Sequence, residues 1–261
     1  MAYEFLQYEL ESGIATLRLN RPKEKNSLNL ELVAELCAAV DLCAADRQAR
    51  VVVLTGAGSA FSAGDDIKIM GMAARMTPDE IAETIDRKGY PALIRKLRGL
   101  PKPVIAAVNG LCYGAGGELA LACDYTIASQ EATFGQLYIN LGLMGNTWLL
   151  PRRVSAKKAL DLIWSGRILS ADEALALGIA DQVVPAEKLE EATGKLAGRL
   201  AKGPTLAYGL AKQAVYRGME LGLDAGLTEM TALQARLMKS ADHAEGVKAF
   251  LEKRKPVYKG E

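Results

Sequence analysis

The pattern of hydrophobic and polar positions in the first part of the chain predicts strands followed by a helix. Residues 14–20 follow a period of two, as in a strand with one buried face, and residues 6–10 form a similar run before them. After a polar loop, Leu32, Leu36 and Val40 recur at helical spacing. Residues 51–56 then form a short apolar run, which is typical of a strand buried on both faces.

Two capping boxes predict the starts of further helices. They are Thr77-Pro78-Asp79-Glu80 and Ser170-Ala171-Asp172-Glu173. The first of these helices must end by the Leu100-Pro101-Lys102-Pro103 segment, because the two prolines interrupt a helix. Between the boxes we expect four elements in order: a buried strand at 104–108, a helix at 117–123, a strand at 124–128 and a loop through residue 147.

The last part of the chain has a different character. Residues 181–185 predict a late strand, and from about residue 186 the pattern is only helical. Strands that alternate with helices indicate an α/β core, here followed by an all-helical segment. We therefore expect a core of residues 1–200 and a helical region of residues 201–261.

Composition narrows the possible chemistry. The 261 residues carry 32 basic and 31 acidic side chains, so a net charge of +1 gives no field that would attract nucleic acid or anionic lipid. The only histidine, His243, leaves no histidine-rich metal site and is expected to be a surface residue near a helix start. Acid–base chemistry in such a chain would depend on carboxylates, tyrosines or backbone amides.

The cysteines and the absence of targeting signals predict a cytoplasmic protein. Cys37, Cys43, Cys112 and Cys123 form no C-x-x-C pair and lie in apolar stretches, as reduced core thiols do. The chain has no apolar run of 18 residues and starts without a secretory signal pattern.

Two glycine-rich segments follow the two buried strands directly. They cover residues 56–68 and 109–118, and in an open α/β sheet ligands bind beyond the carboxyl ends of such strands. Small residues let a ligand approach backbone N–H groups, and the second segment leads into a helix N-terminus. Neither has the spacing of a phosphate-binding loop, so nucleotide binding is disfavoured. Taken singly, each could also be only a tight turn.

Together these segments resemble the crotonase (enoyl-CoA hydratase/isomerase) superfamily. The resemblance covers essentially the whole chain and rests on an ordered set of motifs: Asn20-Arg21-Pro22, Val53-Leu54-Thr55-Gly56, residues 60–68, residues 102–110, Ala122-Cys123-Asp124, Phe134-Gly135-Gln136 and residues 245–254. It implies a crotonase-like spiral of ββα turns with a C-terminal helical trimerisation region. It also implies acyl-CoA chemistry through a thioester enolate, of hydratase or isomerase type.

The resemblance also implies catalytic roles for particular residues. The backbone N–H groups of Asp65 and Ala115 would form an oxyanion hole, and Glu118 would be the acid/base. Fixed donors aimed at a developing enolate contribute roughly 3–4 kcal/mol each. We expect Asp65 to act through its main chain, with its side chain pointing elsewhere, because a carboxylate in the hole would oppose an enolate. Glu118 could instead be a glutamate that only stabilises a helix N-terminus.

One position departs from the hydratase pattern. Tyr138 stands where classical hydratases carry a second glutamate, and a neutral tyrosine is a poor general base. Hydration, double-bond isomerisation and decarboxylation of a malonyl-type (methylmalonyl-CoA-like) ester all share the enolate and stay open. Tyr138 is a candidate catalytic residue that could donate a proton or orient water, or it could be a packing aromatic.

The resemblance further implies coenzyme A contacts and a homo-oligomer. The implied contacts are Lys23, Lys25, Ala63, Asp66, Ile67, Lys68 and, toward a neighbouring subunit, Phe250 and Lys253. We expect a homotrimer or a dimer of trimers, no metal or redox cofactor beyond the substrate's coenzyme A, and neither a nucleic-acid nor a membrane partner. A noncatalytic RNA-binding relative is the rival of another class, and the lack of a basic stripe disfavours it.

Overall fold

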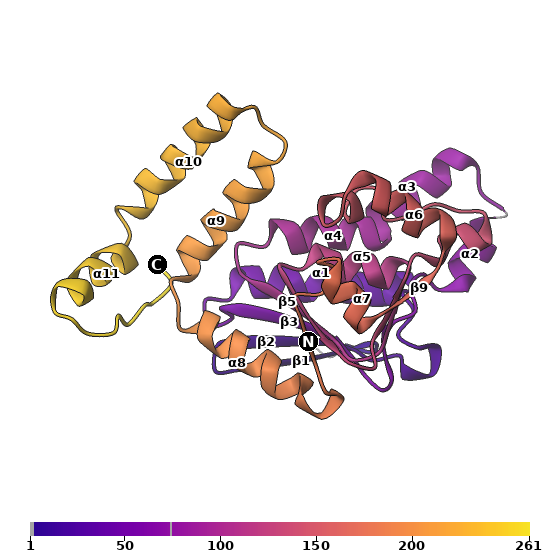
Figure 1. Cartoon of the computed structure of the whole chain (residues 1–261), viewed down its shortest axis with the longest axis horizontal. Helices are drawn as coiled ribbons and strands as arrows, with labels where there is room; N and C mark the ends of the chain where they lie inside the picture. Colours follow the sequence, from indigo (N-terminus) through magenta and orange to yellow (C-terminus); the bar gives the residue numbers. More distant parts are fainter. Residues whose placement is uncertain (1–2, 74) are drawn as a thin grey trace.

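The larger of two sheets contains the strands that the apolar runs predict. The computed structural model describes residues 3–73 and 75–261. Six strands form this sheet in the order β1(Leu6–Glu11), β2(Ile14–Leu19), β3(Val51–Gly56), β5(Val104–Val108), β7(Tyr125–Ser129) and β10(Gln182–Val184) (Figure 1). β1 and β2 are antiparallel, and the other neighbours are parallel.

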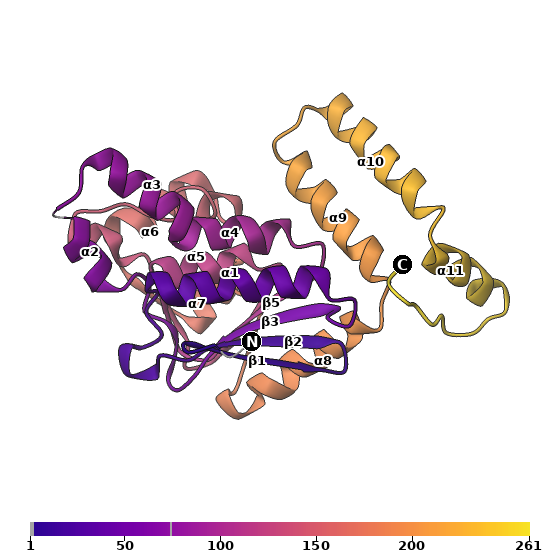
Figure 2. The same ribbon diagram turned by 180° about the vertical axis from the view of Figure 1, so that it is seen from behind.

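The two central strands, β3 and β5, are buried on both faces. Every residue of both is buried, and alternate side chains enter two different clusters. Val52 and Leu54 belong to the main core, whereas Val53 and Ile105 pack under α8(Leu189–Ala201). The main core lies against α1(Leu30–Ala45), α4(Tyr90–Gly99) and α5(Ala115–Ala122) on the other face of the sheet (Figure 2).

A second sheet is built from strands too short for sequence periodicity to reveal. Its order is β4(Ala60–Ser62), β6(Leu111–Tyr113), β8(Thr133–Gly135) and β9(Ile168–Ser170). β4 and β6 lie inside the glycine-rich segments and pair with each other in parallel. Each therefore follows a strand of the first sheet and precedes a helix. This repeated strand–strand–helix turn is the spiral that the resemblance implies, and the fold class is confirmed.

The expected helix between Thr77 and Pro101 is two helices. α3(Pro78–Lys88) begins at the predicted capping box, but it ends at Gly89, after which α4 begins with Pro91 in its first turn. Gly89 is extended, and a Cβ there would lie 2.6 Å from the Ile85 carbonyl oxygen, so glycine permits this close turn. The short helix α2(Ile67–Ala73) was not predicted either.

The remaining core elements are short. They are α6(Ala156–Ser165), α7(Ala171–Ala176), which begins at the second capping box, and the 3-10 helices η1(Pro22–Glu24), η2(Leu137–Leu141), η3(Leu150–Arg152) and η4(Ala186–Lys188). The four cysteines are free thiols. Within residues 3–73 and 75–261, no helix is both long and apolar enough to span a lipid bilayer.

The C-terminal segment is an arm of helices that projects from the core. It consists of α9(Thr205–Gly218), α10(Leu223–Leu237) and α11(Ala241–Leu251), and both views show it beyond the sheets (Figures 1 and 2). Asp124 of the core anchors its first helix: the Lys212 ammonium lies 2.9 Å from this carboxylate, and the Tyr216 hydroxyl donates to it at 2.7 Å. After residue 186 the described elements are all helical, as predicted.

Candidate active site

The two glycine-rich segments meet at adjacent turns. Gly64 and Gly114 adopt positive φ angles of 96° and 50°, which favour glycine. A Cβ on Gly64 would lie 2.8 Å from the Tyr113 carbonyl oxygen and 3.2 Å from the Ala115 nitrogen. The backbone amides of Asp65 and Ala115 therefore lie on neighbouring turns, although 50 positions separate them in the sequence.

Both amides are available to a ligand. Ala115 is the first residue of α5, so its N–H has no acceptor within that helix. Among the turn and loop hydrogen bonds of residues 3–73 and 75–261, neither the Asp65 nor the Ala115 amide is a donor. The N-terminus of α5 adds positive potential at the Ala115 side.

Glu118 lies in the first turn of α5 and is buried, with 7% of its surface exposed. Its Oε1 accepts a hydrogen bond of 2.7 Å from the Asn146 backbone N–H. Burial raises the pKa of Glu118 to about 7, against the opposing effects of the Asn146 amide and the Tyr90 hydroxyl. A carboxyl with a pKa near neutrality can both take and give a proton at physiological pH.

Tyr138 lies between the two segments and contacts the side chain of Asp65. Its hydroxyl donates to Asp65 Oδ2 at 3.1 Å, and its ring packs against Gly114 and Gly145. Burial raises the pKa of Asp65 to about 6, and the Tyr138 hydrogen bond opposes that rise. The expectation that the Asp65 side chain would point away from the site is therefore wrong, because the phenol holds this carboxyl inside.

Two further residues at Glu118 were not predicted. Tyr90, at the start of α4, donates its hydroxyl to Glu118 and lowers the pKa of that carboxyl. Asn146 supplies the backbone donor described above. The Asn146 side chain donates in turn to Gln136 Oε1 at 3.0 Å. Tyr90 carried no signal in the sequence, since an aromatic residue in an amphipathic helix is ordinary. Asn146 lies in the expected loop through residue 147, where the sequence pattern carries no sign of a contact with Glu118.

A cavity of about 350 Å³ opens beside these carboxyl groups. Asp65, Tyr90 and Tyr138 lie at its polar end. Its other lining residues are mostly apolar and come from α1, α2, α3 and the loops beside them: Leu30, Ile69, Met76, Ile81, Thr84, Ile85, Gly89, Leu143 and Met144. The cavity therefore suits an apolar chain whose reactive end faces the carboxyl groups.

The residues expected to contact coenzyme A lie in two places. Lys25 and Ala63 are adjacent, since the Ala63 N–H donates to the Lys25 carbonyl at 2.9 Å. Lys23 in η1 and Ile67 and Lys68 at the start of α2 are exposed. Asp66 differs from these residues because it is buried and its carboxylate pairs with Arg21 at 2.9 Å.

Phe250 and Lys253 lie elsewhere, on and after α11. Both views place this helix at the opposite end of the molecule from α2 and α3, which line the cavity (Figures 1 and 2). The Phe250 side chain is 83% exposed. Within one chain, therefore, these two residues do not join the others.

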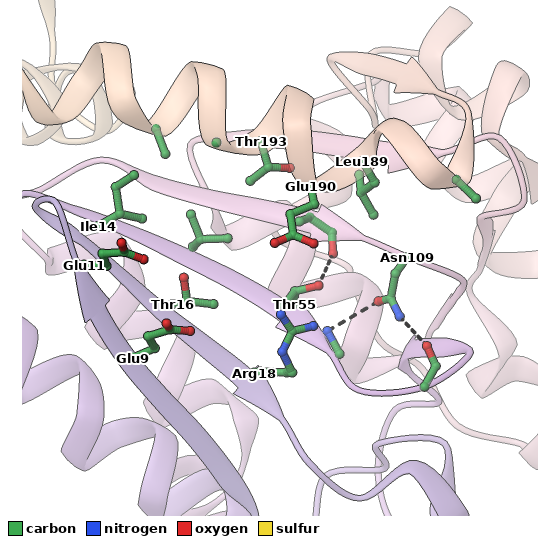
Figure 3. A pocket seen from close by; sticks show the side chains of 17 residues that line it. Glu9, Glu11, Ile14, Thr16, Arg18, Thr55, Asn109, Leu189, Glu190 and Thr193 are labelled. Carbon is green, nitrogen blue, oxygen red and sulfur yellow. Dashed lines mark hydrogen bonds between the residues drawn. The ribbon is translucent and has the colours of Figure 1, made fainter.

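A second cavity, of about 510 Å³, lies on the other face of the large sheet beneath α8 (Figure 3). Glu9, Glu11 and Arg18 of β1 and β2 line it together with Glu190 and Thr193 of α8. It lacks Asp65, Tyr90 and Tyr138, which line the smaller cavity, so the smaller cavity is the candidate reaction centre. In the described residues, no three His, Cys, Asp or Glu side chains gather as a possible metal site.

Comparison with known protein families gives a match over nearly the whole chain. The model of the enoyl-CoA hydratase/isomerase family matches residues 9–261. A probable enoyl-CoA hydratase of Rhodobacter capsulatus is 40% identical over 263 residues, with 100% of both chains covered. The 1,2-epoxyphenylacetyl-CoA isomerase of Escherichia coli is 40% identical over 260 residues, which cover 98% of this chain and 99% of that one.

Solved structures give the same result. A crystal structure of an enoyl-CoA hydratase subunit from Geobacillus kaustophilus superposes with a TM-score of 0.92. The two sequences are 40% identical, and the superposition covers 99% of each chain.

Proposed function

This chain belongs to the enoyl-CoA hydratase/isomerase family, and from that premise we propose that its smaller cavity binds the acyl part of a CoA thioester and reacts it through an enolate. The observation that carries the proposal is the meeting of two free backbone amides with a buried, protonatable Glu118. Members of the family are named hydratases and isomerases of CoA thioesters, so the substrate class follows from the family.

The Asp65 and Ala115 amides are the proposed oxyanion hole. A thioester carbonyl placed at the two turns would accept both N–H groups, which stabilise the negative charge of the enolate more than the neutral ground state. Neither amide is a donor in the turn and loop hydrogen bonds of the described chain, and the Asp65 amide acts only on the carboxyl of its own residue.

Glu118 is the proposed acid/base. It can remove the proton next to the thioester carbonyl, or activate water, and return a proton later, because burial brings its pKa to about 7. The Asn146 amide orients its Oε1. No metal or redox cofactor takes part in this proposal.

The lining of the cavity favours hydratase or isomerase chemistry over decarboxylation. A malonyl-type ester would bring a further carboxylate beside Glu118 and Asp65, and none of the described residues that line the cavity is basic. Like charges in such a site repel each other. An apolar enoyl chain has no such conflict with Ile81, Ile85 and Leu143.

Coenzyme A and assembly complete the proposal. Lys23 in η1, Lys25 directly after it and Lys68 in α2 are exposed near the turns, where a CoA phosphate could bind their ammonium groups. Phe250 and Lys253 would reach the site of a second copy, within a homotrimer or a dimer of trimers. The apolar surface of α9, α10 and α11 supports such a contact.

The function is tested by incubation with crotonyl-, 3-enoyl-, aryl-enoyl- and methylmalonyl-CoA. Mass spectrometry with chromatography distinguishes addition of water, an unchanged mass at a new retention time, and loss of carbon dioxide. We expect one of the first two results, and Glu118→Gln should lower that turnover by about 100-fold while acyl-CoA still binds. Turnover of the Gln variant at the wild-type rate would remove Glu118 from its role, and inertness of the wild type toward every thioester would contradict the function itself.

A further inference from the structure

The side chain of Asp65 brings a carboxyl group into the cavity, whose wall also includes Tyr90, the hydrogen-bond donor to Glu118. It lines the same apolar space that Glu118 adjoins, and the Tyr138 hydroxyl donates to its Oδ2 at 3.1 Å. The next residue, Asp66, turns the other way and pairs with Arg21 outside the cavity. The direction of the Asp65 side chain is therefore a specific feature of this loop.

The groups that face Asp65 and Glu118 are acidic or neutral. Tyr138 faces Asp65 from η2, Tyr90 faces Glu118 from α4, and the two carboxyls influence each other. Within residues 3–73 and 75–261, neither carboxyl forms an ion pair or is influenced by a basic side chain. Burial beside these acids raises the pKa values of both tyrosines, which keeps the phenols neutral donors.

Two buried carboxyls without a cation cannot both carry charge at low cost. Desolvation penalises each charge, and mutual repulsion penalises the doubly ionised state further. Such a pair holds one proton across the range between its two ionisations, and its titration belongs to the pair. At that stage the site contains one carboxylate and one carboxylic acid, which is what a proton transfer between two carbons requires.

We propose that the Asp65 side chain is a second acid–base group, which works opposite Glu118 in isomerising an apolar enoyl-CoA, with Tyr138 as the residue that positions it. This inference rests on the proposed function. It narrows the reaction from hydration or isomerisation to isomerisation alone, in which the double bond shifts along the acyl chain. It also gives position 138 a role without a second glutamate, because Tyr138 acts through Asp65.

The proposed step balances without a co-reactant. The Glu118 carboxylate takes a proton from the carbon next to the thioester, and the C–H electron pair moves onto the thioester oxygen to give the enolate. The Asp65 carboxyl then gives its proton to the distal carbon of the double bond. The enolate electrons return to restore the thioester carbonyl, and the new double bond forms next to it. The electron pair of the original double bond forms the new C–H bond at the distal carbon. Glu118 has gained one proton and Asp65 has lost one, and exchange with solvent restores both when the product leaves.

The test compares Asp65→Asn with the wild type on a 3-enoyl-CoA. The substitution removes the acid and keeps the main chain, so the Asp65 amide remains. We expect kcat to fall about tenfold or more, with KM within about threefold of the wild type. Because a buried acid with a raised pKa is replaced by a neutral group, the variant should be no less stable than the wild type, and Asp65→Ala provides a second variant.

The pH profile of kcat/KM separates a chemical role from a structural one. The wild type needs one proton on the pair, and on Asp65 within it, so its profile should be bell-shaped, with limbs at the two ionisations of the pair. In Asp65→Asn only ionised Glu118 is needed, so the alkaline limb should disappear. Tyr138→Phe should keep both limbs but shift the one that depends on Asp65.

Labelling gives a further readout. In heavy water the wild-type product should carry deuterium at the distal carbon in every turnover, because the donor differs from the base. In Asp65→Asn, Glu118 must carry the same hydrogen across, so unlabelled product should appear. Wild-type kcat and an unchanged bell in Asp65→Asn would overturn the inference while leaving the proposed function intact. A wild type that converts no enoyl-CoA would overturn both, and one that only adds water would overturn the inference alone.

Discussion

Asp65 and Asp66 are neighbours of the same chemical type in opposite surroundings. Asp66 pairs with Arg21 at 2.9 Å and also accepts the Lys68 backbone N–H at 3.0 Å, so it is a buried charge with its partners in place. Asp65 faces an apolar cavity and has the Tyr138 phenol as its donor. One carboxylate therefore fixes the loop, whereas the other remains free to exchange a proton.

The buried Glu118 should make the protein less stable as the pH rises. Its pKa is about 7 in the fold against 4.5 for the free side chain, so the folded state binds more protons between these values. Stability is then highest below the lower value and falls as pH rises through the higher one. Glu118→Gln cannot ionise, so it should be more stable than the wild type by roughly 1–3 kcal/mol at pH 8 and by little at pH 4.

Denaturant unfolding at a fixed protein concentration at the two pH values measures this difference. Equal stabilities of Glu118→Gln and the wild type at pH 8 would contradict the burial of an ionisable group at this position.

Gly145 sets the position of the Tyr138 ring. A Cβ at residue 145 would lie 2.2 Å from the Tyr138 Cε2, so Gly145→Ala must displace the ring and with it the hydrogen bond to Asp65. We expect at least a tenfold loss of turnover from such a displacement. Gly99→Ala is the matched control, because nothing lies within 4 Å of the added Cβ there, and its turnover should match the wild type. A fully active Gly145→Ala would show that the ring position does not matter.

At the scale of elements, the helix break at Gly89 shapes the cavity. Because of this break, Ile81 and Ile85 of α3 line the apolar end of the cavity. A separate helix, α4, begins at Tyr90, which lies beside Glu118. No residue of α3 is buried. The stability of this helix therefore depends strongly on its N-terminal cap, where Thr77 and Glu80 form the complete capping box.

Removing that cap should loosen the apolar wall of the cavity. Thr77→Ala is expected to cost α3 about 1 kcal/mol, which exposes its amides to hydrogen exchange and raises KM for long acyl chains more than for short ones. Ser170→Ala removes the equivalent box from α7, which does not line the cavity, and should leave KM unchanged. Hydrogen exchange over 78–88 and steady-state kinetics measure both effects, and equal KM changes in the two variants would argue against a role for α3.

Local patterns predicted the elements whose causes are local. The apolar runs 51–56 and 104–108 and the two capping boxes each became the expected strand or helix start. The short strands β4 and β6 could not be predicted, because they exist through pairing with each other. The direction of the Asp65 side chain was likewise hidden, since its donor is 73 positions away.

At the scale of the whole molecule, the arm presents apolar side chains that the single chain leaves uncovered. Leu223 is 77% and Phe250 is 83% exposed, and Val215, Leu251 and, directly after α9, Met219 are also exposed. Apolar surface of this extent, gathered on one arm, typically marks a protein interface. The proposed contact between copies would cover it.

A charge on this surface should separate the copies. We expect Leu223→Asp to shift the wild-type oligomer toward monomers in light scattering coupled to size-exclusion chromatography, because an aspartate would be buried without a partner. Gln213→Glu adds a charge at an exposed polar position of the same arm and should leave the mass unchanged. A monomeric wild type would contradict the proposed assembly.

Arg98 connects this arm to the active-site loop. Its guanidinium lies 3.5 Å from the ring centre of Tyr216 on α9 and 5.1 Å from that of Trp148, two residues after Asn146. The Asn146 amide is the one that holds Glu118. The arm is therefore linked to Glu118 within one chain, through Arg98 and the segment from Asn146 to Trp148.

The two free amides also have a genetic consequence. An N–H belongs to every residue except proline, so the proposed oxyanion donors at 65 and 115 are encoded by the path of the backbone and by no particular codon. Nearly every missense change at position 65 would alter the acid and spare the donor. A substitution at codon 65 can thus change the acid, and with it the reaction, while the proposed oxyanion hole is retained.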